Sequence, residues 1–155
     1  MGRIDYYHDP AAPAANSLVV GSSAVVVDDQ NRIILHRRSD SGNWALPSGA
    51  MDIGETFAES AIREVREETG FHVKINRIVG IYSDPGHVFA YDDGEIRQEF
   101  SICLACDITG GALSVSGEST AVEFFAFDAI PGLQMHESVR VRIRDYLEDK
   151  PPVLR

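Results

Sequence analysis

Three glutamates, Glu64, Glu67 and Glu68, lie close together near the end of a segment with the apolar periodicity of a helix. At about 100° per residue they share an arc of roughly 100° on one helix surface. The helix dipole disfavours negative charge there, and Glu64 and Glu68 repel each other at i,i+4 spacing. A divalent cation would offset this repulsion, because Mg²⁺ takes carboxylates and substrate phosphates as ligands. A solvated acidic helix face is the alternative for these residues alone.

The helix that positions these carboxylates has clear end signals. Thr56 precedes the apolar-periodic run and Glu59 follows three residues later, which is the pattern of a capping box. Gly70 is placed to end the helix as a C-terminal cap. The helix face expected to pack on the core carries Phe57, Ala58, Ala61, Ile62 and Val65.

A wider pattern decides between the metal site and the solvated face. It comprises Gly49, Glu55 and the run Arg63-Glu64-Val65-x-Glu67-Glu68-x-Gly70-Phe71. With this pattern the chain resembles the Nudix hydrolases, whose signature is filled at every defined position. Less specific likenesses are Trp44-x-Leu46-Pro47, His36-Arg37-Arg38 and Glu123-Phe124-Phe125. The resemblance extends over residues 18–147 and implies a mixed α/β (α+β) fold, with a mixed β-sheet sandwiched between helices.

The resemblance also implies roles for individual residues in metal-dependent hydrolysis of a diphosphate. Glu64, Glu67 and Glu68 would ligate the catalytic Mg²⁺, or Mn²⁺ in its place. Glu55 and Arg63 match the family's structural ion pair, which orients the metal-binding helix. Ser48 stands where the family has a glycine and would offer its backbone carbonyl to the metal. A serine would be strained there if the position needed a positive φ.

A general base or further metal ligand is implied beyond this motif. Glu118, within Gly117-Glu118-Ser119-Thr120, best matches one position from which the family draws it. An exposed loop acid without a role is the alternative for Glu118. Glu99, within an expected strand, is the second candidate, although a strand glutamate can simply face solvent.

The sequence patterns that indicate contacts to substrate are less specific. Arg37 and Arg38 could bind phosphate, but neighbouring strand residues point to opposite faces, so at most one should reach the site. Pro85 lies at a spacing after Gly70 that resembles ADP-ribose hydrolases, although a proline in a turn needs no such reason. Tyr82, like Phe89 and Tyr91, could stack on a base or pack in the core. His87 and His136 could contact substrate, and a loop histidine without a role is the alternative.

Three functions stay open. The favoured one is hydrolysis of a nucleoside diphosphate linked to another moiety, such as ADP-ribose or a nucleotide sugar. The alternative within catalysis is a pyrophosphohydrolase that cleans up nucleoside triphosphates. A non-catalytic regulatory module that binds nucleotides is a third interpretation, which the complete set of carboxylates disfavours.

Composition narrows the classes of partner. The 155-residue chain has 24 acidic and 14 basic residues and a net charge of −10. Such a surface repels phosphate backbones, so we expect no binding to nucleic acid or to anionic membranes. The apolar run 18–27 is shorter than the about 20 residues that span a bilayer, and the N-terminus lacks a secretory pattern. We expect a cytoplasmic protein with a small-molecule nucleotide substrate, and a homodimer stays open.

The order of expected elements favours strands over helices. Residues 1–17 are predicted to be an N-terminal arm, and residues 18–155 a single domain. Strands are expected over 18–27, 32–38, 71–83, 95–107 and 123–127, and a final helix over 138–147. A polar loop should join the third and fourth of these strands. Cys103 and Cys106 lie three apart on a strand, so they should face opposite sides as two separate thiols.

Overall fold

An eight-stranded sheet lies at the centre of the computed structural model, which describes residues 2–155. Its main strands follow the order β11-β4-β3-β10-β7-β12. In that order, their bounds are Ser119–Ala126, Arg32–Arg38, Gly21–Val27, Ser101–Gly111, Phe71–Tyr82 and Val153–Leu154. Short strands β5 (Trp44–Ala45) and β6 (Ser48–Ala50) pair with β4 and β3. The sheet is mixed, because β10 runs parallel to β3 and antiparallel to β7.

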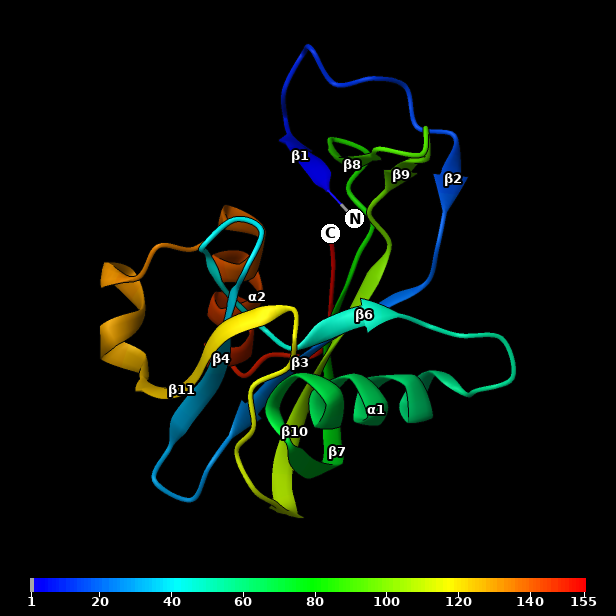
Figure 1. Cartoon of the computed structure of the whole chain (residues 1–155). Coiled ribbons are helices and arrows are strands. Elements are labelled where there is room, and N and C mark those ends of the chain that lie inside the picture. The colour runs from blue at the N-terminus through cyan, green and yellow to red at the C-terminus, as the bar shows by residue number, and fades with distance from the viewer. Residues whose placement is uncertain (1) are drawn as a thin grey trace.

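Helices cover both faces of this sheet (Figure 1). Helix α1 (Phe57–Thr69) packs on one face, and α2 (Glu137–Leu147) with the 3-10 helix η1 (Phe127–Gly132) packs on the other. Side chains alternate between two cores, since a strand points successive residues to opposite faces. Val25 and Cys103 lie in the α2 core, whereas Val26 and Cys106 lie in the α1 core. The predicted sandwich and the opposite orientations of the two cysteines are therefore confirmed.

Helix α1 begins and ends where the sequence predicts. The side chain of Thr56 accepts a hydrogen bond from the Glu59 amide at 3.2 Å, and Glu59 Oε2 accepts one from the Thr56 amide at 2.7 Å. Gly70 ends the helix in the left-handed conformation with a φ of 83°. One expectation is wrong: Ala58 is exposed, while Ser60 is buried. The buried stripe is therefore rotated slightly away from the position that the apolar residues alone indicate.

A second, four-stranded sheet corrects two predictions. Its order is β1-β8-β9-β2, with bounds Arg3–Tyr7, His87–Tyr91, Ile96–Gln98 and Ser17–Leu18. Residues 3–7, predicted as a loosely packed arm, form a strand because they pair antiparallel with β8 along its whole length. Strand β8 itself lies within the stretch predicted as a polar loop. Figure 1 shows this sheet above the central one, away from α1.

The remaining elements differ from the predictions mainly at their ends. Strand β11 begins at Ser119 rather than Glu123, and α2 begins at Glu137 with His136 as its N-cap.

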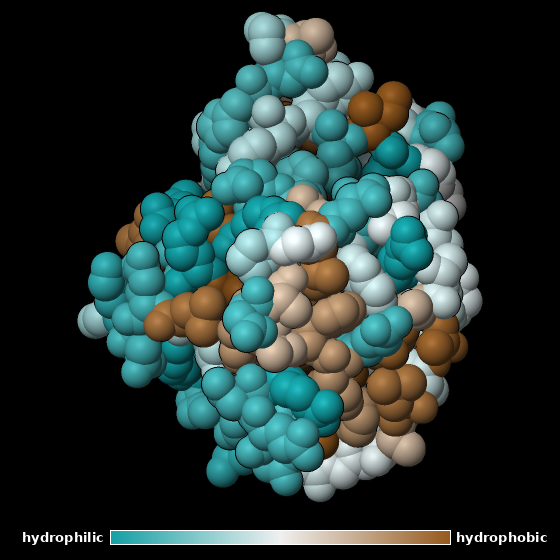
Figure 2. Space-filling model, turned by 90° about the vertical axis from the view of Figure 1, so that its left-hand side faces the viewer, coloured by the Kyte–Doolittle hydropathy of each residue, from teal (hydrophilic) through white to brown (hydrophobic). Residues whose placement is uncertain are grey.

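Within residues 2–155, no helix is both long enough and apolar enough to cross a membrane. Figure 2 shows hydrophilic residues over the top and lower left of one face, with apolar residues gathered between them.

Candidate active site

Gly49 lies directly against the side chain of Glu64. A Cβ atom at this position would overlap the carboxyl carbon and both carboxylate oxygens of Glu64. Glycine leaves room for the Glu64 carboxylate against strand β6, whereas any larger residue would displace this carboxylate. The carboxylate of Glu64, the first glutamate of the acidic cluster, thus lies between helix α1 and strand β6, which carries no side chain at the point of contact.

Ser48 contacts the last glutamate of the cluster through its backbone. Its N–H donates a hydrogen bond to Glu68 Oε2 at 2.7 Å. The predicted strain does not arise, because Ser48 lies in β6 with an ordinary φ. Among residues 2–155, the non-glycine residues with positive φ are His8, Asn31 and Asp149.

Arg63 connects the loop before α1 to the glutamates. Its guanidinium binds Glu55 with both ends of the fork, Nε to Oε2 at 2.9 Å and Nη2 to Oε1 at 2.6 Å. Its Nη1 reaches Glu64 Oε1 at 2.7 Å and Glu67 Oε2 at 3.3 Å. Hydrogen bonds from Arg63 lower the pKa of Glu55 to about 2. The structure thus places Arg63 and Glu55 as the ion pair that the resemblance implies.

Glu68 is an unusual carboxylate, because it is 95% buried near the end of a helix. Burial raises its pKa to about 8, although the hydrogen bond from Ser48 opposes the shift. Nearby, His36 Nε2 lies 3.7 Å from Glu68 Oε2 and has no hydrogen-bond partner among the described residues. Burial lowers the pKa of His36 to about 4, so this imidazole is neutral. Glu64 also has a raised pKa, mainly through burial.

The two candidates for a general base lie in different surroundings. Glu118 is exposed in the loop before β11, and its charge helps to raise the pKa values of both Glu64 and Glu68. It therefore lies close to the acidic cluster. Glu99 is bound to Arg142 at 2.9 Å, and burial raises its pKa. Because Glu99 is already neutralised by a buried arginine, Glu118 is the better placed of the two.

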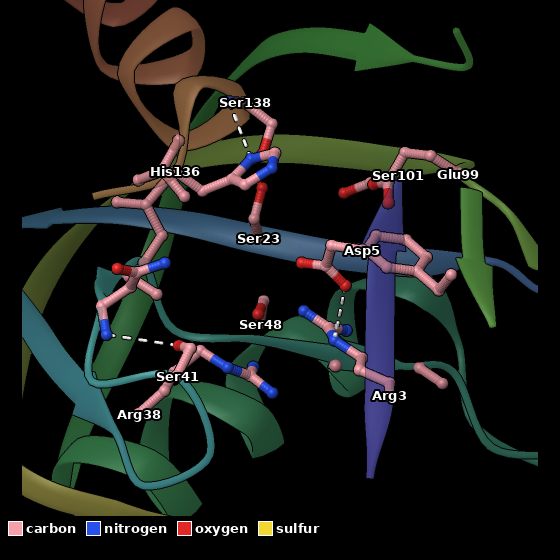
Figure 3. Close-up of a pocket in the computed structure, with 18 of the residues that line it drawn as sticks. Arg3, Asp5, Ser23, Arg38, Ser41, Ser48, Glu99, Ser101, His136 and Ser138 are labelled. Atoms are coloured by element: carbon pink, nitrogen blue, oxygen red, sulfur yellow. Dashed lines mark hydrogen bonds and ion pairs between the residues drawn. The ribbon is translucent and has the colours of Figure 1, made fainter. Parts of the chain in front are cut away.

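A cavity of about 700 Å³ begins at this cluster and extends to the second sheet. Glu68, Ser48 and Glu118 line it at one end, and Glu64 and Glu67 lie beside it on α1 without lining it. Its other walls include Arg3, Asp5, Phe89, Glu99 and His136. Figure 3 shows Ser48 between Arg38 on one side and Arg3 with Asp5 on the other. The cavity falls within the size range of small-molecule pockets, about 300–1,000 Å³.

One of the two candidate phosphate-binding arginines reaches the cavity, as strand alternation predicts. Arg38 lines it and is bound by Asp40, with Nε to Oδ1 at 2.9 Å and Nη2 to Oδ2 at 2.7 Å. Arg37 is exposed and donates from Nε to the carbonyl of Gly42 at 3.0 Å. Arg37 is therefore not part of the site.

The structure does not bring Tyr82 or Pro85 to the cavity. Tyr82 is 5% exposed, packs in the α2 core and donates its hydroxyl hydrogen bond to Asp145 at 2.8 Å. No ring face of Tyr82 is left for a nucleobase, so its predicted role in stacking is corrected. Pro85 is exposed in the turn between β7 and β8 and is not among the residues that line the cavity.

Several residues that line the cavity were missed from the sequence. Arg3 and Asp5 belong to the stretch predicted as an arm, and Arg142 lies in α2. The guanidinium of Arg3 lies over the ring of Phe89, 4.4 Å from its centroid. A signal that could have located β1 is the pair of aromatic residues at its end, since tyrosine favours strands.

A family model, the NUDIX domain, matches residues 18–147. The chain belongs to the Nudix family. An ADP-ribose pyrophosphatase of Methanocaldococcus jannaschii is 33% identical over 134 residues, which cover 81% of this chain and 71% of that protein. A MutT-like protein of Streptomyces ambofaciens is 31% identical over 147 residues, covering 95% and 87%. A NUDIX hydrolase structure from Nitrosomonas europaea shares the fold with a TM-score of 0.71, at 22% identity over 88% and 93% of the two chains.

This Nudix chain is an enzyme that hydrolyses phosphoanhydride bonds, and such enzymes use divalent metals. Its acidic residues fit such an ion on two observations. The buried carboxylate of Glu68 is bound by one backbone amide, beside an unpartnered His36 nitrogen. The space over Gly49, which a Cβ would fill, keeps the carboxylate of Glu64 close to the loop. A buried carboxylate with spare acceptor sites is stabilised by a cation.

Proposed function

We propose that this Nudix enzyme hydrolyses the diphosphate linkage of a nucleoside diphosphate joined to a second moiety, with ADP-ribose or a nucleotide sugar as the favoured substrate. The observation that carries the proposal is the cavity that continues from the acidic cluster to the second sheet. A diphosphate at the glutamates leaves room within it for a further group. The relative from Methanocaldococcus jannaschii, an ADP-ribose pyrophosphatase, supports the same substrate class.

Mg²⁺ is the ion that we assign to the acidic cluster, with Mn²⁺ as a substitute. Glu64, Glu67 and Glu68 would hold it with the backbone carbonyl of Ser48, since Mg²⁺ prefers oxygen ligands. When bound, the metal neutralises phosphate oxygens and makes water a stronger nucleophile. The choice of Mg²⁺ over softer metals rests on the absence of nitrogen or sulfur from this proposed ligand set.

Other residues of the chain position the reactants and move a proton. Arg63 orients Glu64 and Glu67 through its hydrogen bonds to both. Glu118 would accept the proton of the attacking water, because it is exposed beside the cluster and forms no ion pair with an arginine among residues 2–155. Arg38 would contact a substrate phosphate from the cavity wall, in exchange for its present bond to Asp40.

A second candidate function is hydrolysis of nucleoside triphosphates, including oxidised ones, to a monophosphate and pyrophosphate. The MutT-like relative from Streptomyces ambofaciens, which aligns over nearly the whole chain, favours it. In that reaction pyrophosphate would occupy the metal end and the nucleoside the distal part of the cavity. The two functions therefore differ in which products leave the site.

A substrate panel with and without Mg²⁺ separates these functions. ADP-ribose and UDP-sugars should give a nucleoside monophosphate and a sugar phosphate, whereas triphosphates would give a monophosphate and pyrophosphate. The proposal predicts the highest kcat/KM for a compound of the first group, and no turnover in EDTA. A preference for triphosphates would select the second candidate. Binding without turnover in any metal would instead indicate a regulatory module.

Location and assembly stay predictions of the sequence. The two cysteines are free and buried, which suits a reducing compartment such as the cytoplasm. We expect a small-molecule substrate, and the chain as a monomer or homodimer. Light scattering during size-exclusion chromatography would measure the assembly state, and cell fractionation would test the location.

A further inference from the structure

Asp5, His87 and His136 form a cluster on the cavity wall, away from the residues that we assign to Mg²⁺. They come from β1, β8 and the turn before α2, so three distant parts of the chain meet here. One potential ligand atom of each residue lies within 4.8 Å of those of the other two. Figure 3 shows the ring of His136 and the carboxylate of Asp5 turned toward the same part of the pocket.

The pairing of β1 with β8 fixes two members of this cluster on one face of the second sheet. Tyr7 lies opposite His87 and Asp5 opposite Phe89 in the antiparallel register. Residues two apart on a strand share a face, so Asp5 and His87 are diagonal neighbours on that face. The ring of His136 stacks on that of His87 at 5.2 Å and 12°. All three residues line the cavity.

The side chain of His87 points to a missing ligand. It is 96% buried, and its enclosed Nε2 makes no hydrogen bond to any other residue that the structure describes. Buried polar atoms are nearly always satisfied by protein, water or an ion. Burial also lowers the pKa of His87 to about 3, which keeps the imidazole in the neutral form that binds metals.

We propose that Asp5, His87 and His136 bind a transition-metal dication of the Zn²⁺ class, at a second metal site in the same cavity. Two imidazoles and one carboxylate suit Zn²⁺, Co²⁺ or Fe²⁺, whereas Mg²⁺ favours oxygen ligands. Three protein ligands leave at least one coordination position open. That position would face the cavity and could take water or an oxygen of a bound ligand.

Metal binding through Nε2 of His136 requires a change in its hydrogen bonds, because Nδ1 accepts from the Ser138 amide in the structure. Its Nδ1 lies 2.8 Å from Ser138 Oγ and 3.2 Å from the Ser138 amide. If Nδ1 carries the proton and donates it to Ser138 Oγ, Nε2 is free as a ligand. Metal-bound histidines usually donate their other ring hydrogen in this way. Ser138 would thus fix the tautomer of His136. The hydrogen bond from the Ser138 amide to Nδ1, which caps α2, would then be lost.

Arg3 opposes a cation at this site. Its Nε binds Asp5 Oδ1 at 3.1 Å, so the aspartate has one oxygen left for a metal. Removal of the arginine charge should therefore tighten metal binding, while removal of a ligand should weaken it. A metal bound elsewhere would not give opposite changes in affinity when Arg3 and its neighbour Asp5 are replaced. Arg3→Met keeps an unbranched apolar side chain at this position and removes the charged guanidinium, together with its contacts to Asp5 and to the ring of Phe89.

Co²⁺ titration of the metal-stripped, tag-free protein tests the proposal without reference to turnover. Mg²⁺ in large excess keeps the glutamate cluster occupied, and the position and intensity of the visible ligand-field bands distinguish Co²⁺ with histidine ligands at low coordination number from hydrated Co²⁺. We expect one Co²⁺ per chain, displaced by Zn²⁺. His136→Ala and Asp5→Asn should weaken binding at least about tenfold. Arg3→Met should strengthen it.

Matched controls keep the result unambiguous. His72→Ala removes an exposed histidine on β7 and should leave Co²⁺ binding unchanged. Glu67→Gln alters the glutamate cluster and should also leave it unchanged. Circular dichroism would verify that the His136 and Asp5 variants fold. Equal Co²⁺ spectra in the wild type and in His136→Ala, or loss of the spectrum in Glu67→Gln, would overturn the proposal.

Discussion

The guanidinium of Arg63 holds both carboxylate oxygens of Glu55, with Nε to Oε2 at 2.9 Å and Nη2 to Oε1 at 2.6 Å. The same Arg63 side chain donates to the carbonyl of Ala50 at 3.1 Å. It therefore ties α1 to the loop that precedes it, on the side where Glu64 and Glu67 lie. The positions of Glu64 and Glu67 therefore depend on the planar guanidinium of Arg63.

Arg63→Lys should lower activity without unfolding the protein. A lysine keeps the charge but cannot bind Glu55 with two parallel hydrogen bonds, so the glutamates lose their orientation. We expect kcat/KM to fall by about 10- to 100-fold, as for other residues that orient metal ligands. Steady-state kinetics over a range of Mg²⁺ concentrations would measure this. Arg66→Lys, on the exposed side of the same helix, is the matched control; an equal loss there would refute the role of Arg63.

Gly49→Ala should abolish turnover while the fold persists. Its methyl group would occupy the position of the Glu64 carboxylate, which must then move away from the loop. The effect should appear as weaker Mg²⁺ binding and lower kcat, with an unchanged circular dichroism spectrum. Gly132→Ala, where a methyl group meets open space, should retain wild-type activity. Normal kinetics in Gly49→Ala would contradict the tight fit between β6 and α1.

The metal-free protein should lose stability as the pH rises from 6.5 to 8. The pKa of Glu68 is about 8 in the folded protein, against 4.5 for an ordinary glutamate, so the folded protein binds more protons across this window. The loss should approach at most about 1.4 kcal/mol per pH unit. His36, whose pKa is lowered to about 4 from 6.5, acts in the opposite direction and only below this window.

Urea unfolding in EDTA at several pH values measures this dependence. The free energy of unfolding of the wild type should decline toward pH 8, whereas Glu68→Gln should show a flatter profile. Saturating Mg²⁺ should remove the decline, because the ion stabilises the ionised carboxylate. Parallel profiles for the wild type and Glu68→Gln would show that Glu68 is not the group responsible.

Glu118→Gln should reduce kcat more than Glu99→Gln does. A general base contributes about 10²- to 10⁴-fold to rate, and Glu118 is the candidate that lies near Glu64 and Glu68. Its loss should also remove the acidic limb of the pH–kcat profile. Glu99→Gln should chiefly affect KM or stability, because Glu99 is paired with Arg142. The reverse order of the two variants would reassign the base to Glu99.

The sequence predicts local features of this fold well. The ends of α1 follow from Thr56, Glu59 and Gly70, whose hydrogen bonds join residues near one another in the chain. The opposite orientations of Cys103 and Cys106 follow from strand alternation in the same way. Such predictions need no knowledge of which segments meet.

Features that depend on distant pairing were missed. Strand β1 exists because residues 3–7 pair with β8, and neither segment is strongly patterned by itself. Arg3 and Asp5 were therefore absent from the predicted site. The role predicted for Tyr82 was wrong because strand alternation does not tell which face of the sheet packs against α2. Tyr82 lies on that face and binds Asp145. The acidic cluster was predictable because a single helix carries it.

The metal site on α1 is tested most directly by a calorimetric titration of Mg²⁺ into the metal-free protein, with a non-hydrolysable ADP-ribose analogue present. We expect saturable binding to the wild type, and binding to Glu67→Gln that is weaker by at least about tenfold, with turnover lost in parallel. Undetectable Mg²⁺ uptake by the wild type, or equal affinity and turnover in Glu67→Gln, would contradict the assignment of the α1 glutamates as the metal site.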